Sequence, residues 1–416
     1  MFRFFHSADW QLGARFAQFG LRGARLREVR LETLQRALVL AREKSADAFL
    51  IAGDLFEDNQ VADSLVDAVV ELFRSHASVP IYILPGNHDP FTGPDCVWQR
   101  KAFLNSPSHV HVLRQPGVHD LGGAFLVASP LQQKLSTIDP SFRLVELATT
   151  LPADALRIGI THGALAIEGK HSPNDFPIAL NAASRAGLDY LAIGHWHNWL
   201  PDTDGGRIVM PGTPEPDQFA NERCGHIAFV EIERRGEVPR VQQLPVATLN
   251  WKTLAVDFLA LEAARSSLTS TLAELRSTAD RTVLRVTLSG TTSPRVLAET
   301  RMWLESSLQP FLIGQIIDET RIALSAVELA DLKSRHPLLA QTLADIDRLE
   351  SLATGTIASS TEGSNGVNGA ATAPPLTLSE VQGLLGPAKI ELGQLTPHFF
   401  SQLRQILLQT LQEVTT

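Results

Sequence analysis

Several features that mark exported and membrane proteins are missing from this chain. Its 416 residues include only two cysteines, Cys96 and Cys224, too few for a disulfide framework and in keeping with a reducing compartment. No apolar run reaches the roughly 18 residues of a membrane-spanning helix. The N-terminus lacks a basic region followed by an apolar stretch and a cleavage site. We therefore expect a cytoplasmic protein with no membrane partner.

A surplus of positive charge is also missing. The formal net charge is -9, which argues against a surface that is covered by nucleic acid. Residues 1–44 depart from this balance, with nine Lys and Arg against four Asp and Glu, and Arg15, Arg22 and Arg25 lie among them. Two interpretations stay open for these arginines: the solvated face of a helix, or a local patch that contacts phosphates.

What the chain does contain is the pattern of a layered α/β protein. A chain of 416 residues exceeds one ordinary core, so two or three domains are expected. Up to about residue 200, short apolar runs alternate with helical periodicity, which recurs near 26–41 and 61–72. The number of apolar runs predicts two sheets rather than one. Strands are expected at 2–5, 49–52, 81–84, 109–113, 124–129, 156–160, 189–193, 207–210 and 226–233.

The second half of the chain predicts a smaller domain and a linker. From about 251 to 324 the pattern runs strand, helix (259–277), strand (283–288), helix (294–307) and strand. Residues 352–377 are mostly Gly, Ser, Thr and Ala, which cannot bury enough surface to offset the entropy of ordering. An apolar stripe of Phe400, Leu403, Leu407 and Leu411 then predicts a helix. We set the boundaries at 1–250, 251–350, 351–377 (flexible linker) and 378–416 (helical segment).

Five short stretches each place a metal-ligand type of residue just after an apolar strand. They read HSADWQ (6–11), AGDLFED (52–58), PGNHD (85–89), THG (161–163) and GHWH (194–197). In layered α/β folds the carboxyl ends of strands face a common crevice, where side chains distant in sequence converge. The side chains that would converge are Asp9, Asp54, Asn87, His162, His195 and His197.

Such a set of oxygen and nitrogen ligands suits Mn²⁺, Fe²⁺ or Mg²⁺ better than a thiolate zinc site does. Two cations ~3.5–4 Å apart, bridged by one carboxylate, would activate water for attack on phosphorus. Each motif has a plainer interpretation: Gly-Asp as a turn, GNHD as a polar loop, and the two histidines of GHWH as core residues. The five in this order favour the metal site, because coincidence would need every strand to end on a suitable ligand.

The ordered set of Asp9, GD at 53–54, GNHD at 86–89, His162 and GHWH resembles the calcineurin-like metallophosphoesterases. Within that family, HSADWQLG and PGTPEP (211–216) are most similar to the SbcD-type DNA repair exonucleases. The resemblance covers residues 1–250 through motifs and 251–350 only by domain order and size. It implies a four-layer sandwich of two mixed sheets flanked by helices, a smaller α/β capping domain that positions DNA, and a C-terminal helical segment that docks on an SbcC-type coiled-coil ATPase. A homodimer stays open.

The resemblance also implies a role for each motif residue. One metal would be held by Asp9, Asp54 and His197, and the other by Asp54, Asn87, His162 and His195, so that Asp54 is the bridge. His88 matches the catalytic histidine that assists the leaving sugar oxygen, and Asp89 would orient it. The cofactors expected are two divalent ions, with Mn²⁺ favoured over Mg²⁺ or Fe²⁺.

Gln11 departs from the family pattern, which usually has histidine at this position. Three interpretations stay open. Its carbonyl oxygen binds the first metal, more weakly than imidazole binds a transition metal; it acts through a bridging water; or the site is crippled. Trp10 and Trp196, beside the ligands, are open to base stacking or to core packing.

Three functions compete at this stage. The first is a two-metal exonuclease that acts on DNA ends in repair with a partner ATPase. The second is a phosphodiesterase for nucleotides, cyclic nucleotides or other small esters, since the motifs indicate phosphorus chemistry and not polymer length. The third is a weakly active or non-catalytic DNA-end-binding subunit whose first metal site is lost through Gln11. The first is our prediction.

Overall fold

The structure is a computed structural model, and it describes residues 1–322, 326–353, 400, 403 and 404. The chain divides into two compact units. The first takes in Met1–Thr253, Leu275–Arg285 and Leu308–Gly314, and the second takes in the rest. The predicted linker (351–377) and helical segment (378–416) lie, apart from residues 351–353, 400, 403 and 404, outside the described residues, and the sequence-based boundaries stay predictions. No helix within the described ranges is long and apolar enough to cross a membrane.

The first sheet has six strands in the order β12-β11-β1-β2-β3-β4. Strand β1 (Phe2–Ser7) is parallel to β2 (Ala48–Ala52), and β3 (Ile81–Leu84) and β4 (Val110–Val112) continue in parallel. On its other side β1 pairs antiparallel with β11 (His226–Ile232), which is antiparallel to β12 (Arg240–Pro245). The sheet is therefore mixed.

The second sheet also has six strands, in the order β5-β6-β7-β8-β10-β9. Its centre is parallel and consists of β6 (Phe125–Ser129), β7 (Arg157–His162), β8 (Tyr190–Gly194) and β10 (Ile208–Met210). The edges β5 (Gly117–Asp120) and β9 (Leu200–Thr203) are antiparallel to their neighbours. Two mixed sheets confirm the fold that the strand count predicted.

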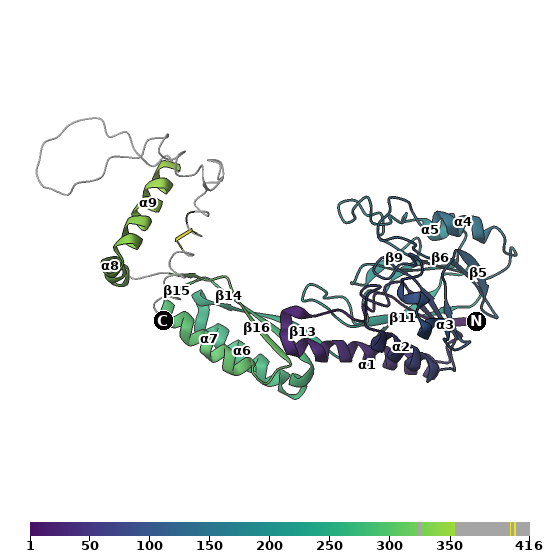
Figure 1. Cartoon of the computed structure of the whole chain (residues 1–416), viewed down its shortest axis with the longest axis horizontal. Coiled ribbons are helices and arrows are strands. Elements are labelled where there is room, and N and C mark those ends of the chain that lie inside the picture. The colour runs from purple at the N-terminus through teal and green to yellow at the C-terminus, as the bar shows by residue number, and fades with distance from the viewer. Residues whose placement is uncertain (323–325, 354–399, 401–402, 405–416) are drawn as a thin grey trace, which may run out of the picture. The chain divides into compact units, whose positions relative to one another are not determined.

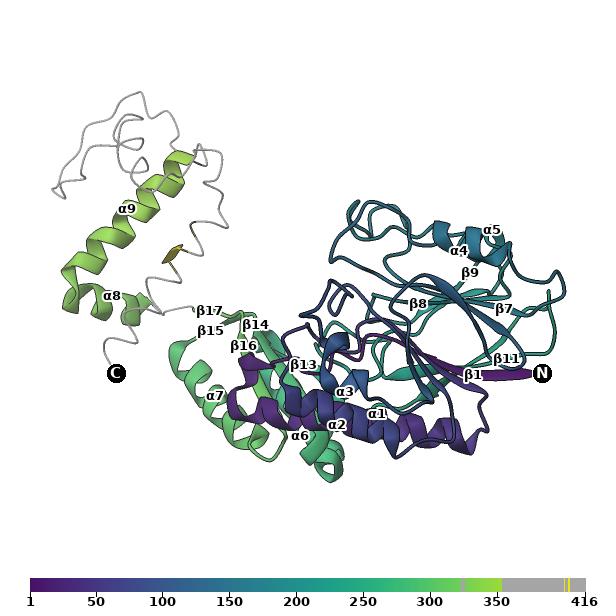
Figure 2. The same cartoon turned by 45° about the vertical axis from the view of Figure 1, so that its right-hand side comes forward.

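Helices cover the outer face of each sheet. Helices α1 (Gly23–Glu43) and α2 (Asp63–Arg74) pack on the first sheet, where Leu34 and Val69 share an apolar cluster with Phe5 and Phe49. Helices α4 (Phe142–Ala148) and α5 (Ala182–Arg185) pack on the second sheet in the same manner. Figure 2 shows the two pairs of helices on opposite sides of the sheets. The short helical turns of this unit are η1 (Ala17–Arg22), η2 (Val97–Gln99), α3 (Lys101–Leu104) and η4 (Leu275–Arg281).

The alternation along β1 explains why four layers form. Successive side chains of a strand point to opposite faces, so Phe5 enters the cluster under α1 and α2, while Phe4 enters a second cluster that also holds Leu50, Ile158 and Ala192. That second cluster takes residues from both sheets and fills the space between them. The predicted four-layer sandwich is confirmed.

The later part of the chain follows the predicted alternation. A three-stranded sheet has the order β13-β14-β16, with β13 at Asn250–Asp257, β14 at Thr282–Ser289 and β16 at Ile313–Asp318. The turn η3 (Phe258–Ala260) and helix α6 (Leu261–Glu274) precede β14, and helix α7 (Pro294–Leu308) precedes β16 (Figure 1). Two-residue strands β15 (Thr291–Thr292) and β17 (Arg321–Ile322) pair in parallel, and helices α8 (Ala326–Arg335) and α9 (Pro337–Ala353) follow.

Candidate metal centre

The five predicted ligand stretches lie at strand ends. Asp9, Asp54 and Asn87 lie just beyond β1, β2 and β3 of the first sheet, while His162 ends β7 and His195 follows β8 of the second. All five strands have their carboxyl ends on this side. The site therefore lies where the loops of the two sheets meet. This is the crevice at the carboxyl ends of the strands where the sequence predicted that the side chains converge.

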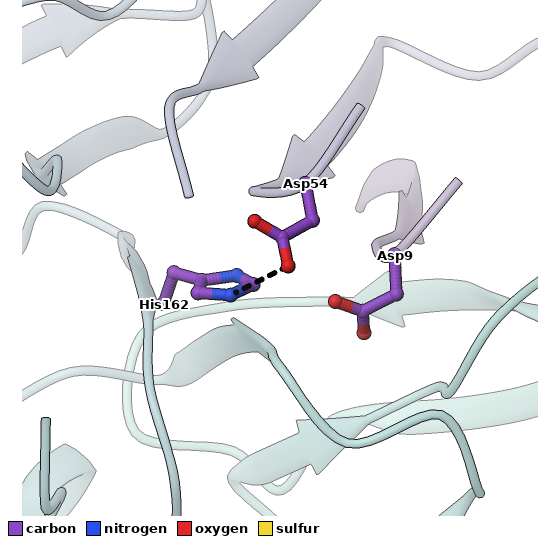
Figure 3. A group of neighbouring side chains, drawn as sticks. All are labelled: Asp9, Asp54 and His162. Carbon is purple, nitrogen blue, oxygen red and sulfur yellow. Dashed lines mark ion pairs between the residues drawn. The ribbon is translucent and has the colours of Figure 1, made fainter. Parts of the chain in front are cut away.

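Asp9, Asp54 and His162 come together in one buried cluster. Each of the three offers a ligand atom, and these atoms lie within 4.8 Å of one another. Figure 3 shows both carboxyl groups on the same side of the His162 ring. The Nε2 atom of His162 is 3.3 Å from Oδ2 of Asp54, and its Nδ1 atom donates to the Ala52 carbonyl at 2.8 Å, which leaves Nε2 for a ligand.

Asn87 joins the same cluster to His195. Its Oδ1 atom is 2.8 Å from Nε2 of His162 and 2.9 Å from Nδ1 of His195. The amide nitrogen of His195 lies 3.0 Å from each carboxylate oxygen of Asp9. The residues that the resemblance implied for the second metal are thus linked by successive contacts from Asp54 through His162 and Asn87 to His195.

His197 lies on the Asp9 side of the centre. Its Nδ1 atom is 2.8 Å from Oδ2 of Asp217, so Nε2 is the nitrogen that remains for a cation. Burial alone would lower the pKa of His197, but the carboxylates of Asp217 and Asp9 raise it to about 9. Asp9 and His197 are thus close enough to interact electrostatically, and their sharing of the first metal stays a prediction.

The backbone at the centre adopts conformations that disfavour ordinary side chains. Asp9 (φ 55°), Gln11 (φ 45°), Asp54 (φ 53°) and His195 (φ 130°) all have positive φ. Such residues cost about 1–3 kcal/mol each and cluster at functional sites. At Gly86, a Cβ atom would come 2.1 Å from Oδ1 of Asp54, so only glycine allows this loop to approach the carboxylate.

Two carboxylates are buried here side by side. Burial raises the pKa of Asp9. At Asp54 burial acts in the same direction, but His162 and His88 outweigh it and hold the pKa of Asp54 well below its usual range. The same pair interaction raises the pKa of His162 to about 9, against the effect of burial. Adjacent buried carboxylates favour a bound cation.

Gln11 supplies an unsatisfied acceptor at the same place. Its Nε2 atom donates to Oδ2 of Asp54 at 3.1 Å, while its buried Oε1 atom has no hydrogen-bond partner among the described residues. A buried polar atom without a partner costs about 1–3 kcal/mol, and a cation or a water would remove that cost. The donor set of carboxylates, amides and imidazoles fits divalent cations that prefer oxygen and nitrogen.

His88 and Asp89 lie beside the centre, with different partners. The backbone amide of His88 donates to Oδ1 of Asp54 at 2.9 Å, and its Nδ1 atom is 2.9 Å from the Glu57 carbonyl. The carboxylate of Asp89 accepts the amides of Phe56 (2.9 Å) and Gly86 (2.7 Å). The ring of His88 is thus oriented by Glu57, whereas Asp89, the predicted orienting residue, ties two loops together.

Sequence reasoning missed two carboxylates that bond the predicted ligands His195 and His197. Asp217 bonds His197, as described above, and Oδ2 of Asp175 lies 2.9 Å from Nε2 of His195. Metal-binding histidines almost always donate their other N–H to a carboxylate or a carbonyl. The signal for Asp217 was its position directly after PGTPEP; Asp175 lies in a loop with no comparable signal.

A third missed residue is Arg30 of α1, which is buried beneath the centre. Its Nε atom donates to the Trp10 carbonyl at 2.9 Å, Nη1 to the Glu215 carbonyl at 2.9 Å, and Nη2 to Oγ1 of Thr213 at 3.1 Å. Trp10 adjoins Asp9, and Glu215 precedes Asp217. Arg30 therefore links the loops that carry opposite sides of the predicted first metal site.

Two of the three predicted DNA-contacting arginines, Arg22 and Arg25, have side-chain partners within the protein. The guanidinium of Arg25 lies 2.6 Å from Glu32, and Nη1 of Arg22 donates to the carbonyls of Phe311 and Leu312 at 3.2 Å. Arg15 is exposed. The contact of these arginines with DNA stays a prediction.

The two tryptophans differ. Trp10 is 1% exposed and its Nε1 atom donates to Oγ of Ser7 at 3.0 Å, as in core packing. Trp196 is half-buried and lines a cleft next to the centre.

Comparison with known proteins places part of this chain in a family. Residues 2–199 match the calcineurin-like phosphoesterases. This segment belongs to that family. The candidate metal centre lies in this segment, and the family consists of phosphoester hydrolases that use divalent metals. The match confirms the predicted family and enzyme class.

Two relatives show how far the similarity extends. The DNA double-strand break repair protein Mre11 of Methanopyrus kandleri is 29% identical over 262 residues, which are 57% of this chain and 55% of that protein. The uncharacterized metallophosphoesterase YhaO of Bacillus subtilis is 22% identical over 370 residues, 83% of this chain and 87% of that protein. The chain thus spans about half the length of the archaeal relative.

Proposed function

We propose that this chain is an SbcD-type two-metal exonuclease that hydrolyses phosphodiester bonds at DNA ends during repair. The observation that carries the chemistry is the buried cluster of Asp9, Asp54 and His162, joined by Asn87 to His195. The choice of DNA is supported by the similarity to an Mre11 protein that is named for double-strand break repair.

In this proposal one cation is held by Asp9, Gln11, Asp54 and His197, and the other by Asp54, Asn87, His162 and His195. Two divalent cations supply a nucleophile from water near neutral pH and stabilise negative charge at phosphorus. We propose Mn²⁺ as the metal, with Mg²⁺ and Fe²⁺ as outcomes of metal analysis.

His88 assists the leaving oxygen in this proposal. Its backbone amide is fixed on Asp54 and its Nδ1 atom on the Glu57 carbonyl. The first hydrogen bond fixes the backbone of His88 and the second fixes its ring, which leaves the Nε2 atom for the ester in this proposal. A positioned imidazole of this kind typically contributes about 10²–10⁴-fold to the rate.

The test is hydrolysis of labelled linear and circular DNA by purified protein in Mn²⁺. We expect nucleotides to be released from linear DNA and not from closed circles, and Asp54→Ala to abolish release. The matched control is Asp67→Ala, which removes an exposed carboxylate of α2 and should retain the activity. The proposal fails if linear DNA is not degraded, or if Asp54→Ala degrades it as well as the wild type does. Turnover of bis-p-nitrophenyl phosphate or a cyclic nucleotide, but not of DNA, would assign a small-ester substrate instead.

The proposal extends to a partner, an SbcC-type coiled-coil ATPase that docks on residues 378–416. Its support is the resemblance of the motifs and the apolar spacing of that segment. Co-purification of an ATPase encoded beside this chain, lost when residues 378–416 are deleted, is the expected result. Retention of the ATPase by the truncated chain would place the contact elsewhere.

A further inference from the structure

A cleft opens directly beside the metal centre. Its volume is about 530 Å³, and its lining includes His195 and His197. Both are predicted metal ligands, so a molecule in this cleft would lie next to the reacting phosphorus. A volume of this size is typical of pockets for single small ligands, roughly 300–1,000 Å³, and it is far too small for a DNA duplex.

Two cationic side chains lie in the wall of this cleft. Lys170 and Arg223 both line it and are exposed, and within the described part of the chain neither side chain has an ion-pair partner. Other arginines of the same unit are paired, for example Arg185 with Asp139 at 2.8 Å and Arg235 with Asp189 at 2.6 Å. Unpaired cations in a chain of net charge -9 favour a local anionic ligand such as a phosphate.

The position of Arg223 is fixed relative to the metal ligands. Its backbone amide donates to Oδ1 of Asn198 at 2.9 Å, and its carbonyl accepts the amide of Trp199 at 2.6 Å. Asn198 and Trp199 immediately follow His197. The loop that carries the cation is thus bonded to the loop that carries the ligand, which sets where a phosphate would be held.

The cleft also offers an aromatic surface. Trp196 lies between the two histidines in sequence, packs in part against the apolar cluster under α4 and α5, and lines the cleft. Nucleic-acid bases stack on such side chains regardless of the nucleotide sequence, because every base has a π-face. Proteins that bind single-stranded nucleic acid typically combine an aromatic side chain with nearby cations in this way.

We propose that this cleft binds one nucleotide of a single DNA strand, next to the bond that is cut. Lys170 and Arg223 contact its phosphate and Trp196 stacks on its base. The inference deepens the proposed function, on which it rests for the identity of the polymer. It adds a specificity: the strand must be unpaired where it enters the cleft, so frayed or single-stranded ends are bound in preference to blunt duplex ends.

Binding can be measured without hydrolysis. Full-length protein in EDTA is titrated against a short fluorescein-labelled oligothymidylate, and anisotropy gives the dissociation constant at several salt concentrations. The double variant Lys170→Gln/Arg223→Gln is expected to bind at least about tenfold more weakly, with a log–log salt slope that is smaller by about one. The matched control, Lys101→Gln/Lys134→Gln, removes two exposed lysines outside the cleft and should stay within about twofold of the wild type. Equal effects of the two double variants would overturn the proposal.

Variants of Trp196 separate stacking from structure. We expect Trp196→Ala to lose about tenfold or more in affinity and Trp196→Phe to recover most of it, with the melting temperatures of both variants recorded in parallel. Unchanged affinity in Trp196→Ala, or no recovery in a folded Trp196→Phe, contradicts the stacking role.

A competition experiment tests whether the cleft binds a nucleotide or only phosphate. Thymidine 5′-monophosphate should compete with the oligonucleotide better than inorganic phosphate does. Equal competition would reduce the cleft to a phosphate site and overturn the nucleotide assignment.

The two proposals fail separately. Oligonucleotide binding that depends on Lys170 and Arg223, without release of nucleotides in Mn²⁺, would refute the exonuclease and leave the nucleotide cleft in place. Release of nucleotides by a double variant with wild-type affinity would refute the cleft and leave the exonuclease. A wild type that binds blunt duplex as tightly as single strands contradicts the inferred preference for unpaired ends.

Discussion

At the scale of single residues, the site depends on side chains that hold the ligands as much as on the ligands. Asp217 fixes His197 through one hydrogen bond of 2.8 Å, and Glu57 fixes His88 through its backbone carbonyl. Such partners set which ring nitrogen is free and where it points.

Removing Asp217 should therefore weaken metal binding. We expect Asp217→Ala to lower the affinity for Mn²⁺ about 10–100-fold and Asp217→Asn, which keeps an acceptor oxygen, to lower it less; isothermal titration of the metal-free protein measures both. Glu222→Ala removes an exposed acid five positions later and serves as the control. An Asp217→Ala affinity equal to that of the control would show that the carboxylate does not position His197.

Gln11 is the residue at which the interpretations of the first metal site diverge. If its carbonyl oxygen is a ligand, Gln11→Ala should lose affinity for one of two Mn²⁺ ions, and Gln11→His should bind that ion more tightly, because imidazole is the better donor to transition metals. Electron paramagnetic resonance of free Mn²⁺ counts the ions bound. Two ions bound by Gln11→Ala with wild-type affinity would leave Gln11 outside the coordination sphere.

His6 gives the fold a pH dependence that the metal does not supply. Burial between the sheets lowers the pKa of His6 to about 3, against about 6.5 in the unfolded chain. Below pH 6.5 the unfolded chain therefore binds a proton that the folded chain does not, so this group removes up to about 1.4 kcal/mol of stability per pH unit between pH ~6.5 and ~3. Urea unfolding at several pH values should show a shallower loss in His6→Gln than in the wild type. Parallel losses would assign the acid sensitivity to other groups.

At the scale of elements, α1 supports the site from beneath the first sheet. Arg30 donates to carbonyls in two loops, and Thr33, one turn further, donates to the Glu215 carboxylate at 2.6 Å. Glu215 in turn accepts the amide of Leu249 at 2.8 Å. Helix α1 thus fixes the position of the PGTPEP loop relative to the loop that carries Asp9.

Arg30→Met should reduce both stability and metal binding. Loss of a buried charged donor with several acceptors costs about 3 kcal/mol, and the freed loops should lower Mn²⁺ affinity as well. Urea unfolding and calorimetric titration provide the two measurements. Arg42→Met, an exposed position on the same helix, should change stability by about 0.5 kcal/mol or less. Similar losses in the two variants would remove the special role of Arg30.

The elements also show how far the sequence was informative. Strand β3 was predicted at its observed bounds because all four of its residues are buried and apolar, as in strands covered on both faces. The edge strand β12 has exposed and polar residues, such as Gln242 and Gln243, and was not predicted because edge strands carry no continuous apolar run.

The residues of the site likewise divide into those that the sequence predicted and those that it did not. The convergence of the motif residues was predictable because each follows a strand, and the topology of parallel strands brings strand ends together; their roles as metal ligands stay predictions. Asp217 was marked only by its position directly after PGTPEP. Glu57, Asp175 and Arg30 were not predictable, since each acts through a contact with a residue distant in sequence; Arg30 and Glu215, for example, are 185 positions apart. Only the packed sheets bring such pairs together.

At the scale of the whole molecule, the local charges near the site differ from the net charge of the chain. A chain with a net charge of -9 places two buried carboxylates at one centre, and in the cleft beside it two cations that have no ion-pair partner in the part of the chain that the structure describes. The first arrangement favours metal ions and the second favours phosphate. Sequence composition reports only the total, which is why the overall charge argued against nucleic acid while the local charges support it.

The central claim is that two neighbouring cations are held by side chains from both sheets. Crystals grown with Mn²⁺ test it most directly, because anomalous scattering locates the ions independently of activity. We predict two anomalous peaks ~3.5–4 Å apart, on either side of the Asp54 carboxylate, one towards Asp9 and His197 and the other towards Asn87, His162 and His195. An empty centre in a Mn²⁺-soaked crystal, or a pair of peaks away from Asp54, would contradict the account.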